Sequence, residues 1–82
     1  MAELSNKEIN KIKIDVPILI GNNIRNLRME KGLSQTELAD RILSDRQYLY
    51  KIETAKVGVT ITKLTMIARA LDVPVSRLVY GV

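Results

Sequence analysis

Two helix-start signals stand close together near the middle of the chain, and they constrain its fold more than any other feature. The first is Ser34-x-x-Glu37, a capping box in which a hydroxyl and a carboxylate bind free N–H groups at a helix start. The second is Ser44 or Asp45, either of which can cap a helix over residues 46–54. The short stretch between these signals leaves room for only one short helix, which a tight turn must join to the second helix.

A longer helix is expected before this pair, over residues 16–31. Asp15 and Pro17 suit its first turn, as a capping carboxylate followed by a proline whose missing N–H costs nothing there. Gly32 suits its end, because glycine readily takes the left-handed conformation that terminates helices. The apolar residues of its buried stripe recur at helical spacing and are Ile20, Ile24 and Leu27.

Two further helices are expected after the pair. Thr60 caps the first of them, and a short helix follows near residues 74–79, where Pro74 interrupts the chain. The apolar face of the first is formed by Ile61, Leu64, Ile67, Ala68 and Leu71. The chain is therefore predicted to form an all-α, compact five-helix domain over residues 16–82, preceded by an N-terminal extension of residues 1–15.

The composition excludes several classes of function. The 82 residues include no Cys and no His, so disulfides and the commonest zinc ligands and general bases are missing. No catalytic, metal or cofactor site is predicted, because the acidic residues occupy ordinary helix-surface or cap positions. No apolar run is long enough to cross a membrane, and the lack of Cys suits a cytoplasmic location. The net charge of +4 lies within residues 18–82 and favours an anionic partner.

The helix over residues 46–54 has an apolar face and a polar face. At about 100° per residue, Tyr48, Leu49 and Ile52 fall on the core side. The opposite arc is polar and partly basic, and it consists of Arg46, Gln47, Tyr50 and Lys51. Because Arg can bind guanine and Gln can bind adenine through paired hydrogen bonds, this face suits base edges in a DNA major groove. A merely solvated face is an equal alternative for this helix taken alone.

Four motifs, in order and with matching spacing, resemble the phage-repressor (Xre/Cro-type) helix-turn-helix family. They lie within residues 20–78 and are Ile24-Arg25-x-Leu27-Arg28, Lys31-Gly32-Leu33-Ser34-Gln35-x-Glu37-Leu38-Ala39, Tyr48-Leu49-x-Lys51-Ile52-Glu53 and Leu64-x-x-Ile67-Ala68-x-Ala70-Leu71-x-Val73. The resemblance implies a lambda-repressor-like fold, a mostly dimeric regulator and double-stranded DNA as partner. It implies that the second short helix enters the major groove.

The resemblance also implies roles for individual residues. Together with the outward arc, it assigns base reading to Arg46, Gln47, Tyr50 and Lys51. The phosphate contacts that it implies are Gln35, Tyr48 and Lys56. Gln35 is also expected to brace Arg46. Arg28 and Glu53 correspond to an ion pair that links the first helix to the third, and this pair is interpreted as scaffold.

The sequence departs from the family pattern around the third helix. Leu43 stands where the family usually has Gly, and Ser44 stands where an apolar residue is usual. The turn between the two short helices is therefore expected to differ in shape. The family often has Arg-Gly where Thr54 and Ala55 stand, so Lys56 is the main phosphate contact expected of the following loop. Fewer phosphate contacts would weaken binding and flatten its dependence on salt.

Two classes of function remain open. The first is a sequence-specific transcriptional repressor or autoregulator that binds as a dimer, with half-sites about one helical turn apart. A controller protein of a restriction–modification system is a variant of this hypothesis. The second is a module that binds a protein partner on the same scaffold, as an antitoxin does. An enzyme is not expected.

The C-terminal end is predicted to form part of a homodimer interface. Its apolar residues are more than one short helix can hide, and they are Val73, Val75, Leu78, Val79, Tyr80 and Val82. Such an interface would present two third helices to successive turns of one DNA face. The alternative is that these residues only close the core.

The extension is predicted to strengthen the same dimer. Residues 12–16 alternate apolar and charged side chains, which is the period of a strand. A lone strand leaves its edges unpaired, so it would pair with its symmetry mate, pack on another subunit or add to a partner's sheet. A disordered tail is an equal alternative for residues 1–10. A basic arm in the minor groove fits less well, because residues 1–17 are net neutral.

Overall fold

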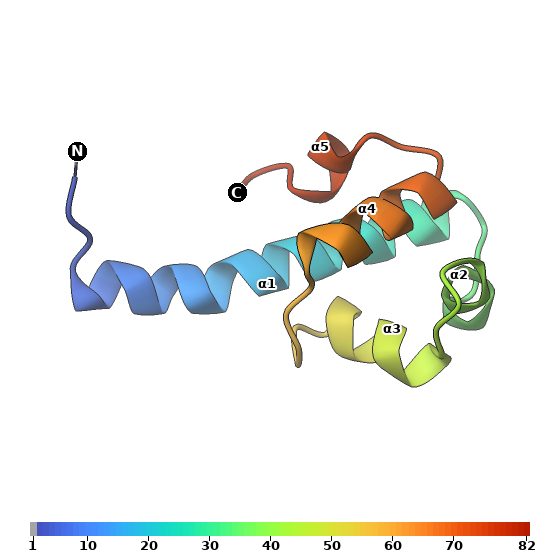
Figure 1. Cartoon of the computed structure of the whole chain (residues 1–82), viewed down its shortest axis with the longest axis horizontal. Coiled ribbons are helices and arrows are strands. Elements are labelled where there is room, and N and C mark those ends of the chain that lie inside the picture. The colour runs from blue at the N-terminus through green and yellow to red at the C-terminus, as the bar shows by residue number, and fades with distance from the viewer. Residues whose placement is uncertain (1) are drawn as a thin grey trace.

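The computed structural model describes residues 2–82 and confirms the all-α, five-helix prediction. The helices are α1 (Asn6–Glu30), α2 (Gln35–Arg41), α3 (Arg46–Glu53), α4 (Ile61–Ala70) and α5 (Val75–Leu78). In Figure 1, the second half of α1 lies among the other helices, with α5 on one side of it and α3 on the other. The first half of α1 projects beyond this body, which makes the molecule 41 Å long but only 23 and 20 Å across. Among residues 2–82, no helix combines the length and apolar character that crossing a membrane requires.

The core lies where the second half of α1 meets the four shorter helices. Its largest fully buried side chains are Ile24, Leu38, Ile42, Leu49, Ile67, Leu71 and Leu78. Burying one such side chain contributes about 1.5–3 kcal/mol. Every helix supplies or flanks at least one of them, so this small core fixes the position of each element.

Local side-chain caps explain where the short helices begin. Ser34 Oγ accepts from Glu37 N, and Glu37 Oε1 accepts from Ser34 N, both at 3.0 Å, which confirms the capping box of α2. Of the two residues predicted to cap α3, Asp45 does so, accepting from Tyr48 N at 2.8 Å. Thr60 caps α4 as predicted. Each such cap contributes about 1 kcal/mol.

The start of α1 was predicted wrongly. Residues 12–16 form no strand but are helical, and Asp15 and Pro17 lie inside α1 instead of at its start. The helix begins at Asn6, after a capping box in which Ser5 Oγ accepts from Glu8 N at 3.1 Å and Glu8 accepts from Ser5 N at 3.4 Å. It continues without a break across residues 15 and 16, where the extension was expected to end.

Contacts at helical spacing explain why the alternating segment is not a strand. Lys11 Nζ and Asp15 Oδ2 form an i, i+4 ion pair of 2.8 Å. Val16 and Ile20 are partly buried on the face that continues to Ile24 in the core. A strand at this place would have no neighbour to pair with among residues 2–82, whereas a helix satisfies its own backbone. Pro17 interrupts that backbone ladder at one N–H only.

Helices α1 to α4 all end in the same way. In each, the residue after the C-cap takes a left-handed backbone conformation, and the next N–H reaches back to the helix to close a Schellman motif. The left-handed residues are Gly32 (φ 73°), Leu43 (φ 54°), Ala55 (φ 59°) and Asp72 (φ 57°). Only the first of these four is a glycine, so three helix ends adopt this conformation with a side chain present.

Candidate nucleic-acid interface

The α3 helix presents a polar face to solvent and a buried face to the core. Leu49 is fully buried, and Ile52 is 2% exposed. Arg46 and Gln47 are exposed in the first turn, Tyr50 is 45% exposed in the second, and Lys51 is partly buried beside them. The structure therefore brings all four residues predicted to read bases, Arg46, Gln47, Tyr50 and Lys51, onto the outward part of one short helix.

A buried ion pair joins α3 to α1. Arg28 Nε and Nη2 donate to the two carboxylate oxygens of Glu53 at 2.7 and 2.9 Å, and only 8% of Arg28 and 5% of Glu53 are exposed. Arg28 Nη1 also donates to the backbone oxygen of Leu33 at 2.8 Å, just before α2. Each nitrogen of the Arg28 guanidinium and each carboxylate oxygen of Glu53 has a hydrogen-bond partner, which offsets the cost of burying their charges. This pair sets the end of α3 against α1, as the family resemblance implied.

Gln35 has a different contact from the one expected. Its Nε2 donates to Glu53 Oε1 at 3.1 Å, rather than to Arg46. The first residue of α2 is thereby attached to the last residue of α3. The side chain remains partly buried at the start of α2.

The turn between α2 and α3 keeps a left-handed residue although it lacks the family's usual Gly. Leu43 has φ 54°, and its side chain is 94% exposed. Ser44 N donates to Ala39 O at 2.9 Å, which closes the end of α2 one residue before the cap of α3. Positive φ is unfavourable for a residue with a Cβ, by about 1–2 kcal/mol. The change of shape expected here is therefore absent at Leu43, which adopts the backbone that a glycine would adopt.

Two further positive charges flank the polar face of α3. Lys56 is exposed directly after the helix, where its N–H closes the left-handed end by donating to Lys51 O at 2.8 Å. On the other side, Lys63 of α4 places Nζ 5.3 Å from the centre of the Tyr48 ring. Tyr48 packs partly against the core, and this burial raises the pKa of its hydroxyl above the usual value of 10.0. Lys63 was missed by the sequence analysis, because its approach to the Tyr48 ring depends on where the fold places α4.

Two residues of α1 that hold other parts of the chain in place were also missed. Gly21 lies where α1 touches the end of α3, so closely that a Cβ would meet Ile52 O at 2.6 Å. Asn23 donates through Nδ2 to Leu78 O at 3.0 Å and to Tyr80 O at 2.9 Å, and so holds the C-terminal segment against α1. An isolated Gly within a helical pattern is a recognisable signal of close approach. The bonds of Asn23 leave no comparable trace in the sequence.

The comparisons with known proteins agree with this geometry. A sequence profile described as helix-turn-helix matches residues 24–78. The control protein C.MunI of a Mycoplasma species is 38% identical over 65 residues, which cover 78% of this chain and 88% of that protein. The crystal structure of the restriction–modification controller protein C.AhdI from Aeromonas hydrophila has a TM-score of 0.73 and 34% identity, covering 76% of this chain and 94% of that one.

A third similarity bears directly on the partner. The master regulator for biofilm formation SinR, solved in complex with DNA, has a TM-score of 0.66 and 37% identity, covering 72% of this chain and 95% of that one. The scaffold that carries the polar face of α3 is therefore the scaffold of DNA-binding regulators. The chain belongs to the helix-turn-helix family and is a DNA-binding transcriptional regulator, which confirms the resemblance seen in its motifs.

Proposed function

We propose that this regulator recognises a specific DNA sequence by inserting α3 into the major groove, as two copies on a two-fold site. The observation that carries the proposal is the exposed polar face of α3, held on a rigid scaffold by the Arg28–Glu53 pair. Arg46 and Gln47 are the residues suited to paired hydrogen bonds with guanine and adenine. Tyr50 suits contact with a thymine methyl or a phosphate, and Lys51 suits guanine or a phosphate.

The phosphate contacts are proposed on both sides of this face. Lys56 is exposed directly after α3, and Gln35 lies at the first turn of α2 beside Glu53. Tyr48 lies in the first turn of α3, with the Lys63 ammonium 5.3 Å from the centre of its ring. Positive groups around a reading helix position it on the duplex without specifying the sequence. The net charge of +4 supports the same anionic partner.

Repression or autoregulation in the cytoplasm is the form of control that we propose. Similarity to control proteins of restriction–modification systems supports a controller as a variant. A module that binds a protein partner is the second candidate. It is favoured by the apolar side chains that the N-terminal half of α1 leaves exposed, among them Ile12 and Ile14.

Selection of bound sequences from random DNA, with the stoichiometry of the complex, tests the proposal. An enriched two-fold motif bound by two chains is expected. Arg46→Ala and Gln47→Ala should each cost about 1–3 kcal/mol on that motif and relax the preference at one base position. Arg77→Ala is the matched control, because Arg77 is exposed on α5, on the side of α1 away from α3 (Figure 1). No enriched motif at moderate salt would instead favour the partner-binding module.

A further inference from the structure

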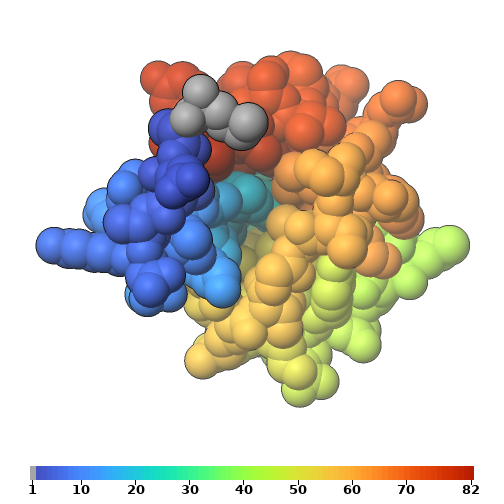
Figure 2. All heavy atoms as spheres, turned by 60° about the vertical axis from the view of Figure 1, so that its left-hand side comes forward, coloured from blue at the N-terminus to red at the C-terminus, as the bar shows by residue number. Residues whose placement is uncertain are grey.

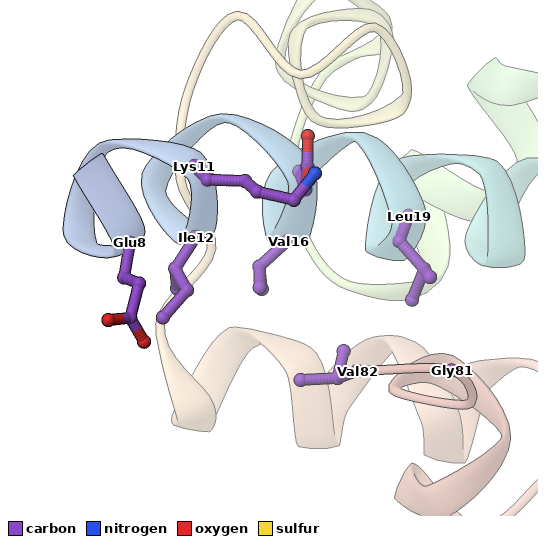
Figure 3. A pocket seen from close by; sticks show the side chains of 8 residues that line it. Glu8, Lys11, Ile12, Val16, Leu19, Gly81 and Val82 are labelled. Atoms are coloured by element: carbon purple, nitrogen blue, oxygen red, sulfur yellow. The ribbon is translucent and has the colours of Figure 1, made fainter. Parts of the chain in front are cut away.

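An open apolar groove lies between the projecting half of α1 and the C-terminal end of the chain. Figure 2, which brings this end of the molecule forward, shows the blue N-terminal half of α1 below the red C-terminal segment. The groove holds about 380 Å³. Ile12, Val16 and Leu19 point into it from α1, and Gly81 and Val82 form its other wall (Figure 3).

The two walls of the groove are held in place. The bonds from Asn23 to Leu78 O and Tyr80 O fasten the C-terminal segment to α1. At Gly81, which has φ 91°, a Cβ would come within 2.9 Å of Leu19 Cδ1, so the walls meet closely at that end. The relative position of the two walls is therefore fixed by contacts within the fold.

The groove lacks a cover within residues 2–82. Ile12 is 47% exposed and Val82 is 67% exposed, although both are large apolar residues. The projecting turns of α1 pack little of their surface against the rest of the chain. An isolated helix of fewer than about 12–15 residues is marginal in water, so these turns would be stabilised by a contact that covers the apolar side chains.

The charges along the groove favour a second copy of this chain as the cover. Glu8, Lys11 and Asp15 line the rim, so charges of both signs occur within two helical turns. A two-fold interface needs such a self-complementary patch, because each surface meets its own copy. Residues 1–17 are neutral, with three lysines and three acidic residues, whereas residues 18–82 carry the full +4. This end of the molecule is thus where two copies repel each other least, and where DNA is attracted least.

We propose that the N-terminal halves of two α1 helices pack antiparallel across a two-fold axis, with Ile12 seated in the groove of the partner subunit. In this arrangement, Lys11 exchanges its ion pair with Asp15 of its own helix for one with Asp15 of the partner subunit. The groove is smaller than a stable interface, which takes about 20–30 residues a side, so the free dimer is weak and a two-fold DNA site reinforces it. The inference deepens the proposed function, since it names the surface through which two copies meet.

Sedimentation of the full chain over a range of concentrations gives the first test. Ile12→Asp should weaken self-association by about tenfold or more, since it places a charge in an apolar contact. Ile14→Asp is the matched control, because Ile14 is 61% exposed on the same helix but does not line the groove, and its association should be unchanged. Two results would overturn the proposal: a chain that stays monomeric at every concentration, or equal self-association of Ile12→Asp and Ile14→Asp. In either case the groove would be a binding site for another protein instead.

A charge exchange and a cross-link test the arrangement itself. Lys11→Glu and Asp15→Lys should each weaken self-association, whereas mixing the two variants should restore it, because opposite charges then meet only across the two subunits and not within one helix. Circular dichroism checks that helix content is retained. The chain contains no cysteine, so an Ile12→Cys variant has one thiol and should form a disulfide dimer, whereas Ile14→Cys should not. If neither the restoration nor the selective cross-link occurs, this geometry is wrong.

DNA selection separates the failure of this inference from the failure of the proposed function. If Ile12→Asp associates normally while Arg46→Ala still alters the selected motif, the groove is not the interface and base reading by α3 stands. If the groove variants abolish association but no motif is enriched with the parent chain, the interface stands and sequence reading fails.

Discussion

The backbone of Gly21 in α1 touches the backbone of Ile52 in α3, because no side chain separates them. A Cβ on Gly21 would lie 2.6 Å from Ile52 O and 2.8 Å from Glu53 O. Both neighbours are backbone atoms, so they cannot move without shifting the end of α3. We expect Gly21→Ala to destabilise the fold by about 1–3 kcal/mol, even though Ala is the better helix former by about 1 kcal/mol.

The same substitution should weaken DNA binding, because a displaced α3 no longer fits the groove as before. Thermal unfolding and binding to the selected site measure the two effects. Gly58→Ala is the control, since a Cβ there meets nothing within 4 Å and its backbone requires no positive φ. Equal stability of the parent and Gly21→Ala would show that α1 and α3 can separate without cost.

The Arg28–Glu53 pair leads to a second prediction. Arg28→Ala should leave Glu53 buried without its main partner, and breaking a buried pair costs about 3–5 kcal/mol. Arg25→Ala, an exposed arginine on the same helix, should change stability by less than about 0.5 kcal/mol. Replacing both partners, as Arg28→Met with Glu53→Leu, should cost less than the two single changes together. Denaturant unfolding measures Arg28→Ala, Arg25→Ala, the double variant and its two single changes, and additive losses in the last three would show that the two side chains are energetically independent.

The parts of the fold that the sequence predicted are those with local causes. Ser34, Asp45 and Thr60 cap helices through atoms three residues away, so a short motif is sufficient to locate each start. The outward face of α3 follows from helical spacing alone, since Leu49 and Ile52 must point to the core. The Arg28–Glu53 pair was implied only by the family resemblance, because its partners are far apart in sequence.

The parts that the sequence did not predict depend on competing local signals or on distant contacts. At residues 12–16 a five-residue alternation fits both a strand and a helix, and the capping box at Ser5 and Glu8 decides in favour of the helix. Ser5-x-x-Glu8 has the same pattern as the capping box Ser34-x-x-Glu37 and is visible in the sequence. Gly21 and Asn23, in contrast, act on residues of α3 and of the C-terminal segment. Their roles follow only from how α1 packs.

The pKa of Glu37 leads to a prediction about pH. The hydrogen bond from the backbone N–H of Ser34 lowers the pKa of this carboxylate below its ordinary value of 4.5. The folded state therefore favours the charged form, so the stabilisation is present above pH 4.5 and is lost as the pH falls through the lower folded pKa. Glu37→Gln keeps a capping group but does not titrate. The melting temperature of the parent should fall relative to that of Glu37→Gln only below about pH 4.5, and a constant difference at all pH values would contradict the assignment.

Leu43 offers a substitution that should increase stability. It holds φ 54° with a side chain that is 94% exposed, so Leu43→Gly relieves backbone strain and gives up almost no buried surface. The relief of about 1–2 kcal/mol exceeds the extra entropy that a glycine loses on folding, which leaves a gain of about 0.5–1 kcal/mol. Thr36→Gly, at an exposed right-handed position inside α2, should change stability in the opposite direction. Chemical denaturation measures both, and a loss of stability in Leu43→Gly would mean that the exposed side chain has a contact of its own.

Lys56 should contribute to affinity without contributing to specificity. It is exposed directly after α3, in a loop where this chain departs from the pattern of its family, and a lysine there can neutralise one phosphate. Lys56→Ala should therefore weaken binding equally on all DNA sequences and reduce the slope of log K against log salt by about 1. Arg77→Ala removes the same charge from the opposite side of α1 and should leave that slope unchanged. The slope is measured by titrating the selected site and a scrambled duplex over a range of salt. A change in the preferred sequence for Lys56→Ala would place this residue at a base edge instead of at the backbone.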